Sequence, residues 1–376
     1  MNYPLLISAV AVVFIVLFIL WYISHNKGEE EEKETPSRVA GAPKQQDDNN
    51  VDFGMWMAHL TSKTKNMTNP FGEKTLQQIT LPGTHDSGAY LLSADLAPGT
   101  TLGVPSVDKL VQAAEKAGLK GLIKSLEFPW ANAQDLRIYQ QARQGIRFFD
   151  IRIVYDDKQK TWRCWHTLMG LPIKSLLSDL KQFLEEFRGE VVVIEFSHLP
   201  SSILKEQAIE FATLVSNTLN GFLLPPSTTF PTLNTMVKTG KRAIVVVGNG
   251  YDELNATYGL WSDSFTLYNN SAGTTNIKTM VDFNKNEANK FKSRRENNQL
   301  FKMSWTLTPD TSSILQGDLL PCTAHNLRQL ADTAAPFLPS FIASQGNQII
   351  CNTIVIDHFE KSELVKLLYK VNAESI

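Results

Sequence analysis

Two histidines, one arginine and four carboxylates lie close to the ends of short apolar runs in this sequence. Their types suit attack on a phosphodiester. A neutral imidazole removes a proton from the attacking hydroxyl, and a protonated imidazole gives one to the leaving oxygen. A guanidinium offsets the charge that develops on the phosphoryl oxygens. The candidates with their motifs are His85 and Asp86 in LPGTHDSG, Asp150 and Arg152 in FFDIR, His166 in CWH, Glu195 in IEFSH, and Asp357 in IDH.

Strands must bring these residues together. Continuous runs rich in Val, Ile and Phe are typical of parallel strands that are covered on both faces. Such runs occur at 146–155, 191–196, 243–247, 300–307 and 353–356, and a shorter one at 76–79 precedes His85. Amphipathic helical patterns occupy 176–187, 203–219, 326–338 and 361–371. This alternation predicts an α/β fold over residues 51–376, a (β/α) barrel whose strand ends meet at one mouth.

The sequence argues against several other classes of protein. Gly248 and Gly250 follow a predicted strand, but Glu253 stands where a dinucleotide-binding loop needs its third glycine. GxSxG and HExxH motifs are absent, and the three cysteines include no CxxC pair for zinc. The formal net charge of -2 gives no general attraction to polyanions, so we expect no nucleic-acid partner.

The first fifty residues differ from the rest in composition. Residues 5–23 are apolar apart from Ser8, and as a helix they would extend ~28 Å, close to the ~30 Å hydrocarbon core of a bilayer. We predict a transmembrane helix as an anchor in residues 1–27, with a cleaved signal peptide or a buried helix as the alternatives. Residues 28–50 are acidic and polar, which is typical of a disordered tether.

The side of the membrane that carries residues 51–376 stays open in this single-pass arrangement. Lys27 and Lys33 follow the apolar run and favour a cytoplasmic position by the positive-inside rule. Glycosylation sequons at Asn66, Asn255 and Asn269 favour the opposite side.

Four motifs in order resemble the X domain of phosphatidylinositol-specific phospholipase C, particularly the compact bacterial-type enzymes and the X-domain-only eukaryotic proteins. They are LPGTHDS, QGIRFFDIR at 144–152, CWHTLMG at 164–170 and VVVIEFSH at 191–198. Weaker similarity continues through SWTLTP at 304–309 to TIVIDHF at 353–359. The resemblance implies a distorted TIM barrel that cleaves membrane phosphoinositide lipids into diacylglycerol and a cyclic inositol phosphate.

The resemblance also implies roles for the acid-base residues, carried over by motif position. His85 would be the general base that takes the proton of the inositol 2-hydroxyl, and Asp357 would orient it. His166 would be the general acid that protonates the leaving diacylglycerol oxygen, and Asp86 would be its partner.

The positive charge of the site is expected to come from Arg152, which would hold the phosphoryl oxygens. Asp150 would hold Arg152 and, with Glu195, would contribute to substrate binding. The calcium-dependent eukaryotic branch of the family instead has an asparagine after the first histidine and two acids on the second strand. The guanidinium therefore favours a site without a metal or other cofactor, although Asp86, Asp150 and Glu195 leave a calcium site open.

Residues 93–130 form a long insertion between His85 and the second strand. Lys109, Lys116, Lys120 and Lys124 share one face of a helical stretch there. We expect the insertion either to touch the lipid surface or to cover the mouth of the barrel, and a solvated surface helix is the simpler alternative.

Two other functions stay open. A glycerophosphodiester phosphodiesterase also uses two imidazoles, but it would need a carboxylate metal site and would be sensitive to chelators. A catalytically inactive, membrane-tethered X domain would bind lipid without turnover. The sequence does not choose among plain, phosphorylated and glycan-linked inositol head groups.

Overall fold

The computed structural model describes residues 51–98, 100, 115–199, 203–292, 299–309, 326–346 and 349–375. The chain divides into two compact units, Met1–Ala42 and Pro43–Ile376, and every described residue belongs to the second. The anchor predicted in residues 1–27 and the tether predicted in residues 28–50 lie outside the described residues. Among the helices that are described, none is long and apolar enough to cross a bilayer.

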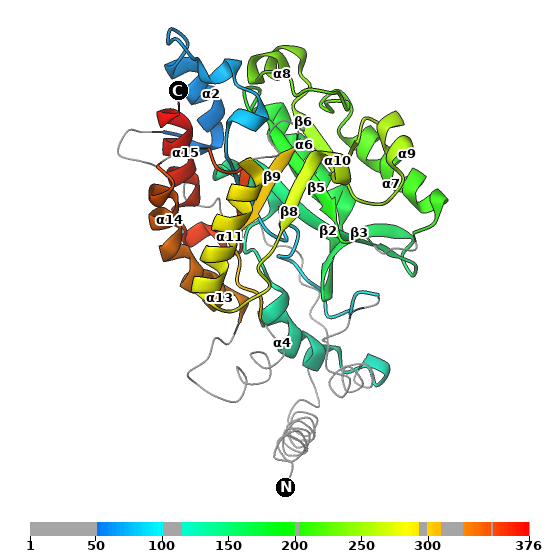
Figure 1. The fold of residues 1–376 in the computed structure, drawn as a ribbon. Helices are drawn as coiled ribbons and strands as arrows, with labels where there is room; N and C mark the ends of the chain where they lie inside the picture. Colours follow the sequence, from blue (N-terminus) through cyan, green and yellow to red (C-terminus); the bar gives the residue numbers. More distant parts are fainter. Residues whose placement is uncertain are drawn as a thin grey trace. The chain divides into compact units, whose positions relative to one another are not determined.

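A curled parallel sheet forms the centre of this unit (Figure 1). Its strands are β1 (Leu81–Thr84), β2 (Phe148–Asp156), β5 (Val192–Ser197), β6 (Ala243–Val247), β7 (Trp261–Ser262), β8 (Leu267–Asn270), β9 (Leu300–Ser304) and β10 (Thr353–Ile356). They lie in the order β7-β6-β5-β2-β1-β10-β9-β8, and every pairing along this order is parallel. Within the described ranges the outer strands β7 and β8 do not pair with each other, so the barrel is open there.

The predicted α/β class and parallel strands are confirmed. β6, β9 and β10 begin at the first residue of the predicted runs, and β2 and β5 begin inside theirs. Ile194, Val245 and Val355 have no exposed surface, as expected for strands that are covered on both faces. Burial of these β-branched side chains is the main term that stabilises the sheet.

The strand before His85 lies later in the chain than the run at 76–79. Leu76–Gln78 is a short 3₁₀ helix, and β1 begins only at Leu81. A Cβ atom at Gly83 of β1 would come within 2.8 Å of side-chain atoms on β10. Glycine is therefore needed where β1 approaches β10. A strand that contains glycine and proline gives little signal in the sequence.

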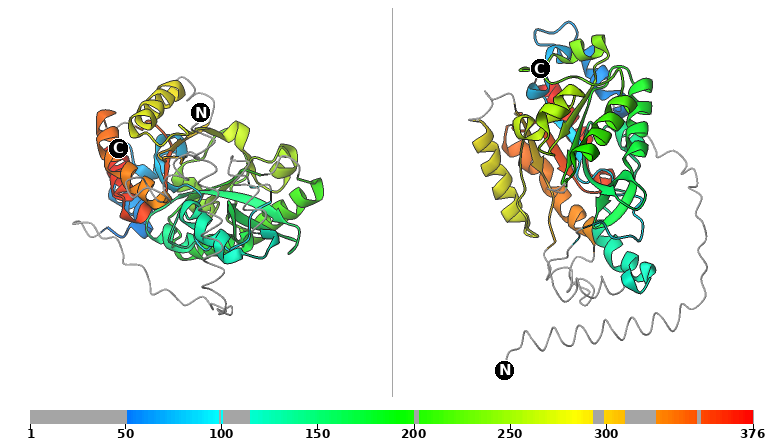
Figure 2. Two further views of the ribbon diagram at one scale, coloured as in Figure 1. Left: turned by 90° about the horizontal axis from the view of Figure 1, so that it is seen from below. Right: turned by 90° about the vertical axis from the view of Figure 1, so that its right-hand side faces the viewer.

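Helices cover the outside of the sheet (Figures 1 and 2). The four predicted helical stretches are confirmed as α6 (Ile173–Glu186), α7 (Lys205–Thr218), α13 (Leu327–Ala334) and α15 (Leu364–Glu374). The other α-helices in the described ranges are α2 (Trp56–Lys63), α4 (Lys120–Ala131), α5 (Ile138–Arg143), α8 (Leu233–Thr239), α9 (Asp252–Thr257), α10 (Asp263–Thr266), α11 (Ile277–Lys292) and α14 (Leu338–Ser344). Figure 1 shows α11, α14 and α15 along one side of the strands.

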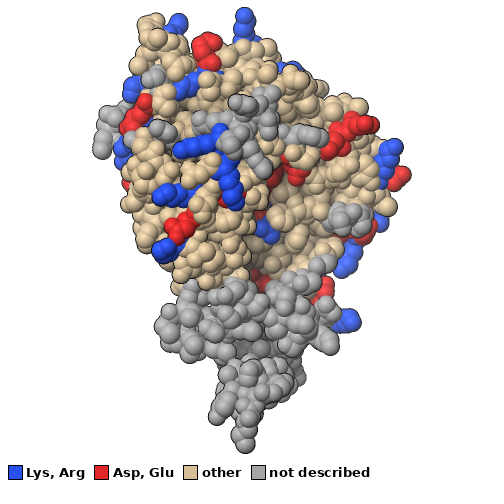
Figure 3. Space-filling view, viewed as in Figure 1, with Lys and Arg blue, Asp and Glu red and all other residues tan. Residues whose placement is uncertain are grey.

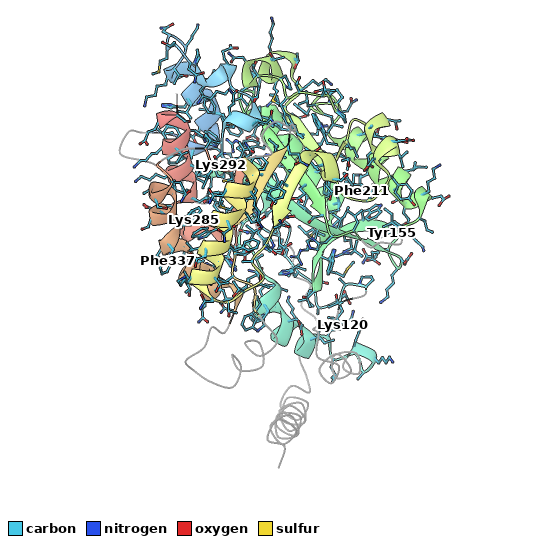
Figure 4. All side chains as sticks on the ribbon, viewed as in Figure 1. Lys120, Tyr155, Phe211, Lys285, Lys292 and Phe337 are labelled. Atoms are coloured by element: carbon cyan, nitrogen blue, oxygen red, sulfur yellow. The ribbon has the colours of Figure 1, made fainter. Side chains whose placement is uncertain are left out.

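CWH lies in a hairpin of β3 (Thr161–His166) and β4 (Leu168–Pro172) and not at the end of a strand of the parallel sheet. β3 pairs antiparallel with β2 and with β4, because a short turn returns the chain to β2 without a crossover helix. Trp162 is fully buried between Tyr155 of β2 and Phe211 of α7, with ring centroids 5.4 and 5.1 Å away. Both partners are labelled in Figure 4. This packing fixes β3, the strand that ends in His166.

A buried ion pair attaches helix α2 to the barrel. Nη2 of Arg147 lies 2.7 Å from Oε2 of Glu190, and neither side chain has exposed surface. Glu190 also accepts hydrogen bonds from the backbone N–H groups of Met57 and Ala58. The first N–H groups of a helix have no partner within the helix, so this carboxylate satisfies donors that would otherwise be buried without one.

The surface of the folded unit is relevant to two sequence expectations, the glycosylation sequons and the lack of attraction to polyanions. Asn255 is fully buried and donates a hydrogen bond to Oδ1 of Asn249, so its sequon has no accessible side chain in the folded unit. Asn66 and Asn269 are exposed. Acidic and basic side chains are interspersed on the face shown in Figure 3, and such a mixture gives no field of a single sign on that face.

Candidate active site

The neighbouring strands β5, β2, β1 and β10 carry all of the sequence-predicted site residues except His166, which ends β3. His85 and Asp86 directly follow β1, and Asp357 directly follows β10. The remaining residues lie within strands, Asp150 and Arg152 in β2 and Glu195 in β5. The carboxyl ends of parallel strands meet at one edge of a sheet, so these side chains gather at the mouth of the barrel.

His85 is held by the carboxylate of Asp357. Nδ1 of the ring lies 2.9 Å from Oδ1 of Asp357. An ionised carboxylate only accepts, so the ring donates its Nδ1–H, and Nε2 is left facing Asp86 and Arg152. In the neutral ring this Nε2 carries the lone pair that can take a proton.

Asp86 lies between the two imidazoles. Its Oδ2 is 3.5 Å from Nε2 of His85 and 3.5 Å from Nε2 of His166, so the two nitrogens are no more than twice that distance apart. Its Oδ1 is 2.6 Å from Nε of Arg152. The carboxylate is buried, and these ion-pair contacts do not have the angles of hydrogen bonds. Two imidazoles at this spacing can both reach oxygens of one phosphate group.

A backbone carbonyl orients His166. Nδ1 of its ring lies 2.8 Å from the carbonyl oxygen of Ala131, the last residue of α4. A carbonyl only accepts, so Nδ1 carries the hydrogen and Nε2 is the atom directed at Asp86. His166 can therefore donate a proton from Nε2 only when its ring is charged.

Gln134 joins the ends of β1 and β10, and the sequence analysis missed it. Its Nε2 donates to the carbonyl oxygens of His85 at 2.8 Å and Ile356 at 3.0 Å. Its side chain is fully buried. Gln134 lies three residues after Ala131, so one short segment contacts both histidines. No local sequence pattern marks it, because its role depends on where the ends of the two strands meet.

The charges of the site shift the pKa values of its histidines in opposite directions. Burial would lower the pKa of His85, but the carboxylates of Asp86 and Asp357 outweigh it and raise that pKa to about 9. Burial lowers the pKa of His166 below its usual value, and Asp86 opposes this only in part. Arg152 and the imidazoles outweigh the effect of burial on Asp86 and hold its pKa well below the usual range. In the free site the proton therefore resides on His85.

Asp150 and Glu195 bind Lys302 and not Arg152, which corrects the expected partner of Asp150. Nζ of Lys302 lies 2.5 Å from Oε2 of Glu195 and 3.2 Å from Oδ2 of Asp150. Ser197 donates to the other oxygen of Asp150 at 2.8 Å. Arg152 is paired with Asp86, because the side chain that follows β1 lies closer to it.

Lys302 is a site residue that the sequence analysis missed, although a signal was present. It is a charged residue inside the apolar run LFKMSWTL, and a lysine is almost never fully buried unless it is paired. The run predicts the strand, but the carboxylates that face it across the barrel are not readable from the sequence.

Non-glycine residues with positive φ occur at three strand ends of the mouth. Asp86 has φ 43°, His198 after β5 has φ 53°, and His358 after β10 has φ 45°. This left-handed conformation costs free energy for residues with a Cβ atom, and it is common where side chains are held for function.

A second cluster beside the mouth consists of Asp135, His358 and Glu360, whose potential ligand atoms lie within 4.8 Å of one another. Arg328 contacts Asp135, and its Nη2 lies 2.9 Å from Nδ1 of His358. Burial and this guanidinium lower the pKa of His358 to about 4. A cation in this position opposes metal binding, so the cluster is an ion-pair network.

The predicted insertion is described in part. Its helix α4 carries Lys120 and Lys124 as exposed residues, and Figure 4 shows Lys120 near one end of the helix. Lys120 pairs with Asp95 at 2.8 Å. Lys109 lies outside the described residues. Ala131, the last residue of α4, directly follows the insertion and contacts His166, so the helix that the insertion contributes to positions this histidine.

Comparison with known proteins places the chain in a family. The family model described as PI-PLC X matches residues 127–369, which include Arg152, His166 and Asp357, while His85 and Asp86 precede the match. The chain is 25% identical over 213 residues to the variant-surface-glycoprotein phospholipase C of Trypanosoma cruzi, covering 54% of each chain. It is 24% identical over 311 residues to PI-PLC X domain-containing protein 1 of Danio rerio, covering 79% of this chain and 93% of that protein. The chain thus spans about half the length of the Trypanosoma cruzi relative.

Solved structures show the same fold. The phosphatidylinositol-specific phospholipase C from Listeria monocytogenes has a TM-score of 0.57 at 17% identity, covering 85% of this chain and 99% of that chain. A mutant of the Staphylococcus aureus enzyme has a TM-score of 0.59 at 18% identity, covering 85% and 98%. With the family model matching more than half of its residues, this chain belongs to the PI-PLC X domain family.

Proposed function

We propose that this protein is a phosphodiesterase that cleaves phosphatidylinositol-type lipids by acid-base catalysis with two histidines. The observation that carries the proposal is that His85 and His166 direct Nε2 at the same carboxylate oxygen, with Arg152 against the other oxygen of that carboxylate. Phosphoryl transfer of this kind uses a base, an acid and a fixed cation around one phosphorus atom, and the proposal assigns these roles to His85, His166 and Arg152.

In the proposed reaction the inositol 2-oxygen attacks phosphorus while Nε2 of His85 takes its proton. The bond from phosphorus to the diacylglycerol oxygen breaks, and that oxygen takes a proton from Nε2 of His166. The products are diacylglycerol and inositol cyclic 1,2-phosphate. Asp357 keeps Nδ1 of His85 protonated and the ring oriented, and Arg152 binds the phosphoryl oxygens.

These roles require the proton to lie on His166, whereas the free site favours His85. An anionic phosphodiester bound beside Arg152 and His166 favours the charged form of His166. Both imidazoles adjoin the phosphate, so the catalytic arrangement is carried by the fraction of the enzyme in which the proton lies on His166.

The membrane lipid would be the partner of this site. We propose that the apolar segment within residues 1–27 keeps the enzyme at a membrane that contains its substrate, with residues 28–50 as the tether. The relatives support the lipid as substrate, since they include phosphatidylinositol-specific phospholipases C by name.

Product analysis with the purified full-length chain and labelled phosphatidylinositol tests the proposal, with and without EDTA. Release of cyclic inositol phosphate that survives EDTA is the expected result. His85→Ala should abolish release while near-UV circular dichroism stays unchanged. Turnover of glycerophosphodiesters that EDTA stops would indicate the second class of enzyme, and lipid binding without any turnover would indicate an inactive X domain.

A further inference from the structure

Asp150 and Glu195 are direct neighbours on adjacent strands. They are register partners of β2 and β5, and their side chains are 4% and 7% exposed. Like charges at paired positions destabilise a sheet, and buried carboxylates need a positive partner. A cation at the mouth of the barrel therefore stabilises this pair of acids in its charged form.

Lys302 provides that cation from the other part of the sheet. It belongs to β9, which pairs with β8 and β10, and its side chain reaches the acids of β2 and β5 and is 2% exposed. The ammonium lies within hydrogen-bond distance of both carboxylates. Burial would lower the pKa of Lys302, but Asp150 and Glu195 raise it above its usual value, so the side chain is charged.

The residues at this place do not fit a calcium ion. Calcium needs about six to eight oxygen ligands at about 2.3–2.6 Å. Here the ammonium occupies the position between the two acids, and Ser197 takes the other oxygen of Asp150. Asp86, the remaining acid that could complete a calcium site, is paired with Arg152. Each of these acids already has a protein cation.

We propose that Lys302 is a built-in counter-ion that occupies the place of a divalent metal between Asp150 and Glu195, which makes the site independent of metal. The inference rests on the proposed function, because it assigns the second fixed positive charge of the same site. It predicts that removal of the ammonium uncovers a calcium site.

Calorimetric titration of the full-length chain with CaCl₂ tests this inference without a readout of turnover. Lys302→Ala should gain saturable binding of one calcium ion, with a dissociation constant of about 0.1–1 mM, and its melting temperature should rise with calcium. The wild-type chain and the double variant Lys302→Ala/Glu195→Gln should lack this site. Because binding and melting are measured directly, loss of catalytic activity in any variant does not affect the result.

Lys302→Gln keeps a polar side chain of similar length and serves if the alanine variant does not fold without calcium. Its melting temperature should be lower than that of the wild type and should rise with CaCl₂. Folding of either Lys302 variant only in the presence of calcium also supports the inference. A folded variant that binds no calcium overturns it. Calcium binding by the wild-type chain that is lost in Glu195→Gln also overturns the inference. Failure of both Lys302 variants to fold at every calcium concentration does so as well.

Discussion

His85 and His166 approach the same atom, Oδ2 of Asp86, each through Nε2 at 3.5 Å. The first imidazole is held on its far side by a carboxylate and the second by a carbonyl. A carboxylate stabilises the charged ring more than a carbonyl does, so the two histidines differ in proton affinity although they share a neighbour.

Asp357→Asn should change the pH profile of kcat/KM. Asp86 and Asp357 together raise the pKa of His85 to about 9, so loss of the Asp357 charge lowers that pKa. The alkaline limb of the profile, where the site loses its last proton, should therefore move from near pH 9 toward neutral pH. We also expect kcat to fall by about 100-fold or more, because the amide lacks the charge that stabilises the imidazolium and its NH2 group can hold the ring in the wrong tautomer. Asp179→Asn, which removes a buried carboxylate paired with Arg137, is the matched control and should leave the profile in place. An unchanged alkaline limb in Asp357→Asn would show that another group sets it.

Arg152→Lys should lower kcat/KM by about 100- to 1000-fold with a phosphatidylinositol substrate. Lysine keeps the charge but loses the planar donor fork that binds two oxygens of a phosphate at once. Initial rates on mixed micelles measure the effect, with the exposed pair residue Arg137 changed to lysine as the control. A loss of less than threefold would remove Arg152 from phosphate binding.

Gln134→Leu should act through the position of His85. Its amide connects the backbone after β1 to the end of β10, so its loss should weaken the hydrogen bond from His85 to Asp357. The expected result is a fall in kcat of about 10-fold and a small shift of the alkaline limb to lower pH, in the same direction as for Asp357→Asn. Gln182→Leu on the exposed face of α6 controls for the substitution itself. A merely structural role would lower the melting temperature and leave the pH profile unchanged.

Glu190→Ala should lower the free energy of unfolding by about 3–5 kcal/mol, because it leaves the buried guanidinium of Arg147 and two N–H groups of α2 without their acceptor. Chemical denaturation monitored by tryptophan fluorescence measures the change. The exposed Glu185→Ala should stay within about 0.5 kcal/mol of the wild type. Equal stability of the two variants would contradict the role given to this ion pair.

The sequence predicts where the strands of this fold lie better than it predicts which strands pair with each other. Apolar runs locate β5, β6, β9 and β10 because burial on both faces imposes one local composition. β1 is short and contains Gly83, so its signal is weak, and β7 and β8 are too short to form a run. The β3 strand has no continuous apolar run, and a tight turn makes it half of an antiparallel hairpin.

The candidate site shows the same division. The histidines, Arg152 and the acids are recognisable because their types and motifs suggest chemistry. Their pairing is not, since Asp150 binds Lys302 across the barrel while Arg152 binds Asp86. Such partners depend on three-dimensional distance between strands that are far apart in the chain.

The absence of pairing between the described strands β7 and β8 affects where this unit opens locally. Strands that end a sheet have backbone amides on one side without a strand partner, and β7 and β8 are both short. Amide hydrogens there should exchange with deuterium much sooner than those of β5 and β2, which lie between neighbours on both sides. The time course of exchange would then divide the sheet into an early-opening margin and a late-opening centre, and the centre carries Asp150, Arg152 and Glu195.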